Sequence, residues 1–504
     1  MGYRIFNKLT KMKYSHKAFV PGNRLTLKDI NQETIDAKYA VRGMIPIIAD
    51  QLNEQISNNP NHKFPFDKII NANIGNPQQL QQSPLTWYRQ VLSILQYPAL
   101  IHNDDVVRHF PKDVIARATT ILDKVGSVGA YSHSQGAAYF RESVAKFIEK
   151  RDGYPSDPNQ IYLTSGASAA VSYLLQVLSN NDQAGFLIPI PQYPLYTATI
   201  ALNKAKPIGY FLDESNNWST DPKQIRSLIE EQNAKGIKIK ALVVINPGNP
   251  TGSILSDSDI KDLIDIAAEY GIVLIADEVY QENIFEGKFT SMKKVLCELI
   301  EKNPELYSNV QLASLHSTSK GVSGECGQRG GYMELAGFKK EITDVIFKLA
   351  SINLCSVVSG QALMELMVNP PKEGDESYAL YKQETEGIMS TLKERAELLY
   401  QAFNKMENIT CNKPMGAMYL FPRLNFDEES FPALFEEARN DNLQVDDIYC
   451  IALLRSTGIC CIPGNGFGQV EGTYHLRTTF LAPGTEWIDQ WSKFHNDFIE
   501  KFKK

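Results

Sequence analysis

Cysteine, histidine and long apolar runs are all scarce in this chain of 504 residues. The seven cysteines are odd in number and form no Cys-x-x-Cys pair, and the eight histidines have no spacing typical of metal ligands. This usage favours reduced, structural thiols in an intracellular protein and gives no reason to expect a metal. The longest apolar runs, such as 241–245, are only strand-length, so we expect no membrane span. A net charge of −7 likewise gives no electrostatic reason to expect nucleic acid.

The remaining composition is that of an ordinary globular protein, with 43% hydrophobic and 22% charged residues. The length predicts two or three structural units. Residues 1–28 stand apart because they carry seven Lys or Arg residues and no acidic residue before Asp29. Such a segment is typical of a mitochondrial presequence, and a basic arm of a cytoplasmic protein is the alternative.

The middle of the chain alternates short apolar runs with helical patterns, which predicts parallel β-α-β units and an α/β fold. This alternation continues to about residue 367, and the polar, proline-broken segment 368–376 is the best candidate boundary. Beyond it, apolar residues from Ile388 to Phe403 recur on one face of a long predicted helix. The expected strands are 160–163, 185–188, 240–245 and 272–276, and the expected helices are 168–178 and the one capped by Ser256.

Lys320 and Asp277 point most clearly to a chemical function. Lys320 follows the hydroxyl residues Ser317 and Ser319, and Asp277 ends an apolar strand three residues before Tyr280. A lysine for a Schiff base, a carboxylate for a ring nitrogen and hydroxyls for a phosphate are the groups that hold pyridoxal phosphate. The layout therefore predicts an enzyme that acts on amino acids.

Purely structural interpretations exist for each of these segments alone. Asp277 could be a helix N-cap or half of a buried ion pair, and Tyr280 could be a core aromatic residue. Asn249 could be part of an Asn-Pro turn. With Asp277 at the end of the adjacent strand, we instead interpret Asn249 as an amide that contacts the ring oxygen of the cofactor, together with Tyr280.

The segment 164–168 joins a predicted strand to a predicted helix and could bind the phosphate. Its small residues would let backbone N–H groups approach an anion, although an ordinary loop with Ser168 as N-cap is the alternative. Arg329 would complete this site with a bidentate guanidinium fork. Tyr193 could cover the ring face or form a rigid aromatic turn between prolines.

Several stretches together resemble the class I/II aminotransferases of fold type I, and within them the alanine-specific enzymes of eukaryotes. The similarity covers nearly everything from about residue 30 to the C-terminus, and 324–331 and 464–477 point to the alanine-specific members. The other stretches are 73–77, 189–196, 245–252, 276–280 and 316–321. The resemblance implies a large domain with a mostly parallel central sheet flanked by helices, and a smaller α+β domain.

The resemblance also divides the chain and assigns roles by position. We expect a basic arm or presequence over 1–30 and the first part of the small domain with a linking segment over 31–110. The large, pyridoxal 5′-phosphate-binding domain would follow over 111–380, and the rest of the small domain over 381–504. The implied roles are the Schiff-base lysine (Lys320), the pyridinium partner (Asp277), ring-oxygen ligands (Asn249, Tyr280), phosphate ligands (Ala167, Ser168, Ser317, Ser319, Arg329), the stacking aromatic (Tyr193) and α-carboxylate ligands (Gly75, Arg477).

Two details qualify this assignment. Tyr131 matches a tyrosine that reaches the phosphate of a neighbouring subunit, which implies a homodimer with shared sites. Arg329 lies nine residues after Lys320, one more than in aspartate-type members, and we interpret this as a loop variation. For Arg477 alone, without the resemblance, a surface arginine on a strand would be the simpler interpretation.

The implied reaction is reversible transfer of the amino group of L-alanine to 2-oxoglutarate. The alternatives are an aromatic or broad-specificity aminotransferase, or a C–S lyase of the same fold. A cofactor-binding regulator is disfavoured because residues 1–60 contain no convincing helix-turn-helix. Two further motifs are set aside: 464–468 lacks the third glycine of a dinucleotide fingerprint and is interpreted as a turn, and Cys460-Cys461 is interpreted as buried thiols.

Overall fold

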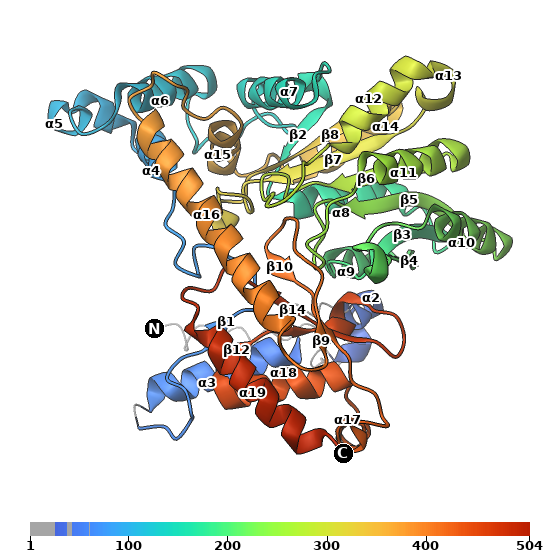
Figure 1. Ribbon diagram of the computed structural model, residues 1–504. Helices are drawn as coiled ribbons and strands as arrows, with labels where there is room; N and C mark the ends of the chain where they lie inside the picture. Colours follow the sequence, from blue (N-terminus) through green and yellow to red (C-terminus); the bar gives the residue numbers. More distant parts are fainter. Residues whose placement is uncertain (1–25, 38–42, 60) are drawn as a thin grey trace, which may run out of the picture.

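The computed structural model describes residues 26–37, 43–59 and 61–504, arranged around a large and a small sheet (Figure 1). The basic segment 1–28 falls almost entirely outside the described residues. Within the described ranges, none of the helices combines the length and apolarity needed to cross a bilayer. The same residues contain no group of three or more His, Cys, Asp or Glu side chains placed to hold a metal ion.

A seven-stranded mixed sheet forms the centre of the large domain. Strand β8 runs antiparallel to both of its neighbours, and all other adjacent pairs are parallel. The four strands expected from the sequence are all present. In spatial order the strands are β2 (Ile161–Thr164), β8 (Gly331–Ala336), β7 (Leu312–Ser317), β6 (Val273–Asp277), β5 (Lys238–Ile245), β3 (Ala184–Ile190) and β4 (Lys206–Phe211).

Helices cover both faces of this sheet because its central strands are apolar on both sides. Leu242 of β5 packs in one core and its neighbour Val243 packs in the other. One face carries α8 (Ala167–Leu178), α9 (Leu195–Leu202) and α14 (Lys340–Ile352). The opposite face carries α10 (Pro222–Ala234), α11 (Asp257–Tyr270) and α12 (Met292–Lys302), followed by α13 (Pro304–Tyr307).

Helix α11 forms where its capping signals predict. The Ser256 hydroxyl accepts from the Asp259 N–H at 3.1 Å and the Asp259 carboxylate accepts from the Ser256 N–H at 3.0 Å, which completes a capping box. Gly271 ends the helix in the left-handed conformation at φ 63°. Ile260, Leu263 and Ile264 then face the core, so the chain re-enters the sheet as β6 directly after the helix.

A third helical layer packs beside β2 and β8. It contains α4 (Thr86–Gln96), α6 (Lys112–Val125), α7 (Ala138–Asp152) and α15 (Val358–Val368), with α5 (Asp104–Val107) between α4 and α6. The predicted boundary 368–376 lies between the end of α15 and the start of α16 (Tyr378–Phe403). In Figure 1, α16 runs from beside α4 and α6 down to the small sheet.

The small domain is built on an antiparallel sheet around β14 (Tyr474–Thr479). On one edge it pairs with β10 (Tyr419–Leu420) and β11 (Arg423–Leu424), and β11 pairs with β9 (Ile409–Thr410). Strand β13 (Ile462–Pro463) also pairs with β14. Strand β1 (Ile70–Asn71) joins β12 (Ile459–Cys460), which brings the N-terminal region to the C-terminal one. The helices of this domain are α3 (Met44–Asn58), α17 (Pro432–Asp441), α18 (Val445–Thr457) and α19 (Glu486–Phe502). The short α2 (Gln32–Asp36) instead contacts α9 of the large domain, where Glu33 pairs with Lys204 at 3.1 Å.

Candidate active site

A cavity of about 340 Å³ lies where the carboxyl ends of β5, β6 and β7 meet the small domain. Neighbouring parallel strands end at one edge of a sheet, so side chains that follow them gather in one place. Every site residue proposed from the sequence lines this cavity except Tyr131. The predicted residues on its wall are Gly75, Ala167, Ser168, Tyr193, Asn249, Asp277, Tyr280, Ser317, Ser319, Lys320, Arg329 and Arg477.

Asp277 is the buried carboxylate of this cavity. Its Oδ2 accepts a hydrogen bond from the Tyr196 hydroxyl at 2.8 Å, while its Oδ1 is buried without a partner. Burial raises the pKa of Asp277, against the hydrogen bond from Tyr196 that lowers it. A buried, half-satisfied carboxylate fits a cationic partner such as a protonated ring nitrogen.

Lys320 follows β7 and points toward the small domain. Its Nζ donates to the carbonyl oxygen of Gly75 at 3.0 Å and lies 5.6 Å from the centre of the Tyr280 ring. The next residue, Gly321, has φ 64° and donates its N–H to Asn283 Oδ1 at 2.7 Å. The loop after the lysine is therefore fixed by a left-handed glycine and a buried amide.

A cradle for an anion lies at the start of α8. Gly166 caps this helix at φ 80°, and a Cβ there would lie 2.3 Å from Nη2 of Arg329. Nη2 of Arg329 donates to the Ser165 carbonyl at 3.0 Å and to Ser168 Oγ at 3.3 Å. A guanidinium beside free helical N–H groups suits a phosphate, so these residues fit the phosphate of pyridoxal phosphate.

Asn249 and Tyr280 lie side by side in the wall, as expected for two groups that share one ring oxygen. Asn249 Nδ2 donates to the Tyr280 hydroxyl at 3.4 Å, and both side chains are buried. Burial raises the pKa of Tyr280 far above its ordinary value, so the phenol stays protonated and can donate a hydrogen bond.

Arg477 projects from β14 and is only 1% exposed, so its interpretation as a surface arginine is wrong. Nη2 donates to the Asn73 carbonyl at 2.6 Å and Nη1 donates to Asn249 Oδ1 at 3.2 Å. Its Nε is buried without a partner. The guanidinium thus keeps donor capacity for an incoming carboxylate.

Three aromatic residues of the site were missed from the sequence. Tyr196 holds Asp277, Tyr419 lines the cavity, and Phe467 packs against Arg477 from the segment interpreted as a turn, which forms a short 3₁₀ helix over Gly464–Phe467. Burial would raise the pKa of Tyr419, but the charges of Lys320 and Arg477 lower it. For Tyr196 a signal existed, since a buried Asp277 requires a hydrogen-bond donor.

Tyr131 does not line the cavity of its own chain. It lies between α6 and α7 and is 79% exposed. Its neighbourhood is fixed by Ser134, whose hydroxyl donates to the carbonyl of the exposed residue Leu354 at 2.7 Å. Its role toward a second subunit stays a prediction.

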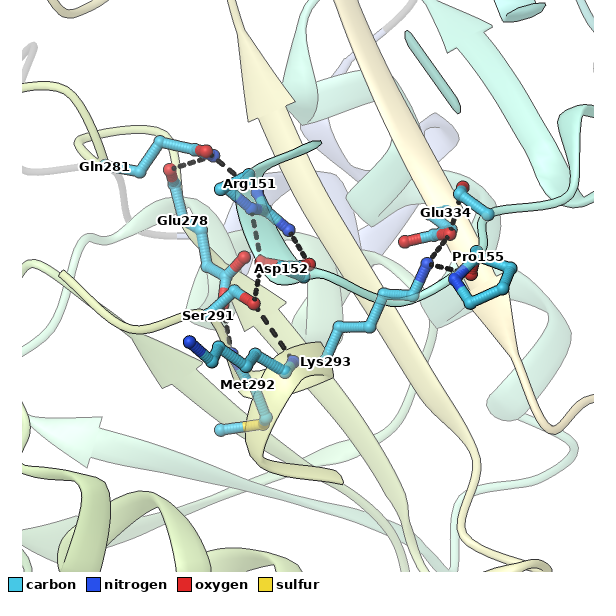
Figure 2. Close-up of polar contacts among 11 residues, drawn as sticks. Arg151, Asp152, Pro155, Glu278, Gln281, Ser291, Met292, Lys293 and Glu334 are labelled. Atoms are coloured by element: carbon cyan, nitrogen blue, oxygen red, sulfur yellow. Dashed lines mark hydrogen bonds and ion pairs between the residues drawn. The ribbon is translucent and has the colours of Figure 1, made fainter. Parts of the chain in front are cut away.

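A cluster of buried charges supports the loop that carries Tyr280 (Figure 2). Glu278, directly after Asp277, accepts from the Met292 N–H at 2.8 Å, and burial raises its pKa to about 7. Arg151 forms an ion pair with Asp152 at 2.6 Å and donates to Gln281 at 2.8 Å. Because these contacts join α7 and the start of α12 to the loop, they fix the backbone on both sides of Tyr280.

Comparisons with known proteins find similarity over most of the chain. Residues 102–487 match the family described as aminotransferase class I and II. The Saccharomyces cerevisiae mitochondrial alanine aminotransferase is 56% identical over 98% of this chain and 83% of that protein. An S. cerevisiae protein named inactive alanine aminotransferase is 54% identical over 96% of each chain. An alanine aminotransferase structure from Pyrococcus furiosus shares the fold, with a TM-score of 0.72 at 23% identity over 94% of this chain and all of the other.

Proposed function

The chain belongs to the class I and II aminotransferases, and on that premise we propose that it is an alanine aminotransferase. It transfers the amino group of L-alanine to 2-oxoglutarate and yields pyruvate and L-glutamate, reversibly. The observation that carries the proposal is the shared cavity of Lys320, the half-satisfied carboxylate of Asp277 and the Arg329 cradle.

Pyridoxal phosphate, when bound, supplies an electron sink that makes the Cα–H bond of an amino acid acidic. Asp277 and Arg329 would hold its ring nitrogen and its phosphate. Lys320 Nζ lies at the Gly75 carbonyl, where it accepts the Cα proton of the amino acid and later releases it. The unpartnered Oδ1 of Asp277 would be free to hold the protonated ring nitrogen, and the hydrogen bond from Tyr196 keeps that carboxylate in place.

Arg477 binds the α-carboxylate that both substrates share. Its planar fork matches a carboxylate in a way that an ammonium group does not. Because Nη1 of Arg477 is bonded to Asn249, the α-carboxylate site is joined directly to the residue proposed for the ring oxygen. Gly75 leaves room for the substrate beside Lys320, since it has no side chain.

Three alternatives to this function need a direct test. The chain could be an aromatic or broad-specificity aminotransferase, or a C–S lyase of the same fold. It could also be inactive, because one relative is named an inactive alanine aminotransferase. Initial rates with L-alanine, L-phenylalanine and a cysteine thioether, each with 2-oxoglutarate, separate these. We expect pyruvate and glutamate in equal amounts from L-alanine. A faster reaction with phenylalanine, or thioether cleavage, would contradict the proposal.

We further propose a homodimer in which each site uses Tyr131 of the other subunit. The high exposure of Tyr131 and the nearby exposed Leu354 support this arrangement. Lys320→Ala and Tyr131→Ala chains, each weakly active or inactive alone, should regain activity when unfolded together and refolded as a mixture. Each hybrid dimer would then contain one site with both native residues. Absence of any regain in a dimeric mixture would contradict shared sites.

For the compartment we propose the mitochondrial matrix or the cytoplasm. The basic, acid-free composition of residues 1–28 supports a presequence, and the S. cerevisiae relative is named as mitochondrial. A basic arm on a cytoplasmic enzyme is the alternative.

A further inference from the structure

The guanidinium of Arg477 lies against two aromatic rings. Its Cζ is 4.3 Å from the centre of the Tyr419 ring and 4.6 Å from the centre of the Phe467 ring. Tyr419 is 3% exposed and Phe467 is completely buried. At these distances an arginine is attracted by the negative face of an aromatic ring, and exclusion of water strengthens that attraction.

This arginine has no acidic partner. Among the residues that the structure describes, no carboxylate forms an ion pair with Arg477, and its protein acceptors are two neutral amide oxygens. Burial of a cation without an anionic partner costs desolvation free energy. The two rings offset part of that cost, which in other buried arginines a carboxylate offsets. The positive charge therefore stays available for the carboxylate of a substrate.

The two rings come from the elements on either edge of β14. Tyr419 belongs to β10, which pairs with β14 through Tyr419 and Thr479. Phe467 follows β13, which pairs with β14 through Ile462 and Arg477. The Phe467 carbonyl also accepts from the Gln192 N–H at 2.8 Å, next to Tyr193 in the cavity wall. Sheet pairing thus fixes the rings independently of the substrate.

We propose that Tyr419 and Phe467 form an aromatic clamp that positions Arg477 for the α-carboxylate and makes the site selective for amines that carry one. The clamp rests on the proposed function, because it assumes that Arg477 meets the substrate. Phe467 does not line the cavity, so it acts through Arg477 as a positioning residue. Tyr419 lines the cavity, and its hydroxyl group lies close to Lys320. We therefore assign only the aromatic ring of Tyr419, and not its hydroxyl group, to the clamp.

The test measures binding apart from turnover. The cofactor-loaded protein is titrated with 2-aminoisobutyrate, which has the carboxylate but no Cα proton, and with ethylamine, which has no carboxylate. Visible absorbance of the bound cofactor reports both. Phe467→Leu should weaken 2-aminoisobutyrate binding roughly five- to thirty-fold and change ethylamine binding less than about twofold. Tyr419→Leu should behave similarly toward the carboxylate, and it should bind 2-aminoisobutyrate several-fold more weakly than Tyr419→Phe, which also lacks the hydroxyl but keeps the ring.

Three results would overturn the clamp. Parent-like 2-aminoisobutyrate binding by Phe467→Leu would show that the ring is dispensable. Equal weakening of both ligands would show a general structural defect instead. If Phe467→Leu does not fold, equal carboxylate binding by Tyr419→Leu and Tyr419→Phe would likewise show that an aromatic ring is not needed. A parent protein that binds cofactor but not 2-aminoisobutyrate would contradict the proposed function itself. If the parent binds 2-aminoisobutyrate and the variants bind it equally well, only the clamp is contradicted.

Discussion

Replacement of Gly75 by alanine places a methyl group in the middle of the proposed site. A Cβ at this position would lie 2.1 Å from the Tyr419 hydroxyl oxygen and 3.2 Å from Lys320 Nζ. Gly75 does not have a positive φ, so glycine is required here by the lack of space for a side chain and not by the backbone conformation. The Tyr419 ring rests on Arg477 and has little freedom to retreat.

The expected cost follows from this overlap. The tyrosine must move by roughly 1 Å, and overpacking of a buried site costs about 1–3 kcal/mol of stability. A displacement of that size at reacting groups lowers activity on the order of 100-fold. We therefore expect Gly75→Ala to fold, to lose roughly 100-fold in kcat/KM for alanine, and to unfold at a lower temperature.

Gly387→Ala is the matched control. Gly387 lies inside α16, and a Cβ there would have no neighbour within 4 Å. The same change should leave activity intact and stabilise the protein by about 0.5–1 kcal/mol. Steady-state rates and thermal unfolding are measured on both variants. A second variant, Gly75→Ala with Tyr419→Phe, removes the 2.1 Å contact and should be more active than Gly75→Ala alone. Parent-like kinetics of Gly75→Ala would refute this packing of the site.

Four further predictions concern other parts of the chain. Lys320→Ala should abolish steady-state turnover while cofactor binding, followed by absorbance, persists. Asp277→Asn should lower kcat for every amino donor alike, and Tyr196→Phe should do so more weakly; a loss confined to one donor would make Asp277 a substrate contact. Burial raises the pKa of Glu282 to about 7 from 4.5, so the stability that it contributes is present below about pH 4.5 and is lost as the pH rises through 7. Glu282→Gln removes this loss, so its gain in free energy of unfolding over the parent should be larger at pH 8 than at pH 5 by on the order of 2 kcal/mol. A gain that is the same at both pH values in denaturant melts would contradict this. Removal of residues 1–28 should leave activity intact, and a uniformly cytoplasmic signal from a C-terminally tagged full-length chain would exclude the presequence.

Strands β2, β3, β5 and β6 and helices α8 and α11 were predictable from the sequence because their signals are local, whereas the central strands β7 and β8 were not predicted. Buried parallel strands such as β6 are continuous apolar runs, and α11 carries its own capping residues. Strand β4 was not predicted because it lies at the sheet edge, is half exposed and contains Pro207 and Gly209. The two-residue strands of the small sheet are too short for any periodicity to identify them.

In the candidate site, too, some residues could be placed from local sequence signals and others could not. Asn249 and Asp277 follow predicted strands, so the order of those strands was enough to place the two residues together. Lys320 follows β7, a strand that was not predicted, and only its motif and the resemblance placed it in the site. The contacts of Arg477 with Tyr419 and Phe467 depend on the register of β10 and β13 against β14. Local patterns do not contain that register, and the glycine-rich segment before Phe467 gave only a turn signal.

The most direct test of the central claim is one half-reaction of the purified, cofactor-loaded protein. L-alanine is added without any keto acid, and pyruvate is measured together with the visible spectrum. The proposal predicts one pyruvate per active site, a spectral change that is complete within the same time, and its reversal by 2-oxoglutarate. If the folded, cofactor-loaded protein forms no pyruvate from L-alanine, the claim is contradicted, and the chain would lack activity like the relative that is named inactive.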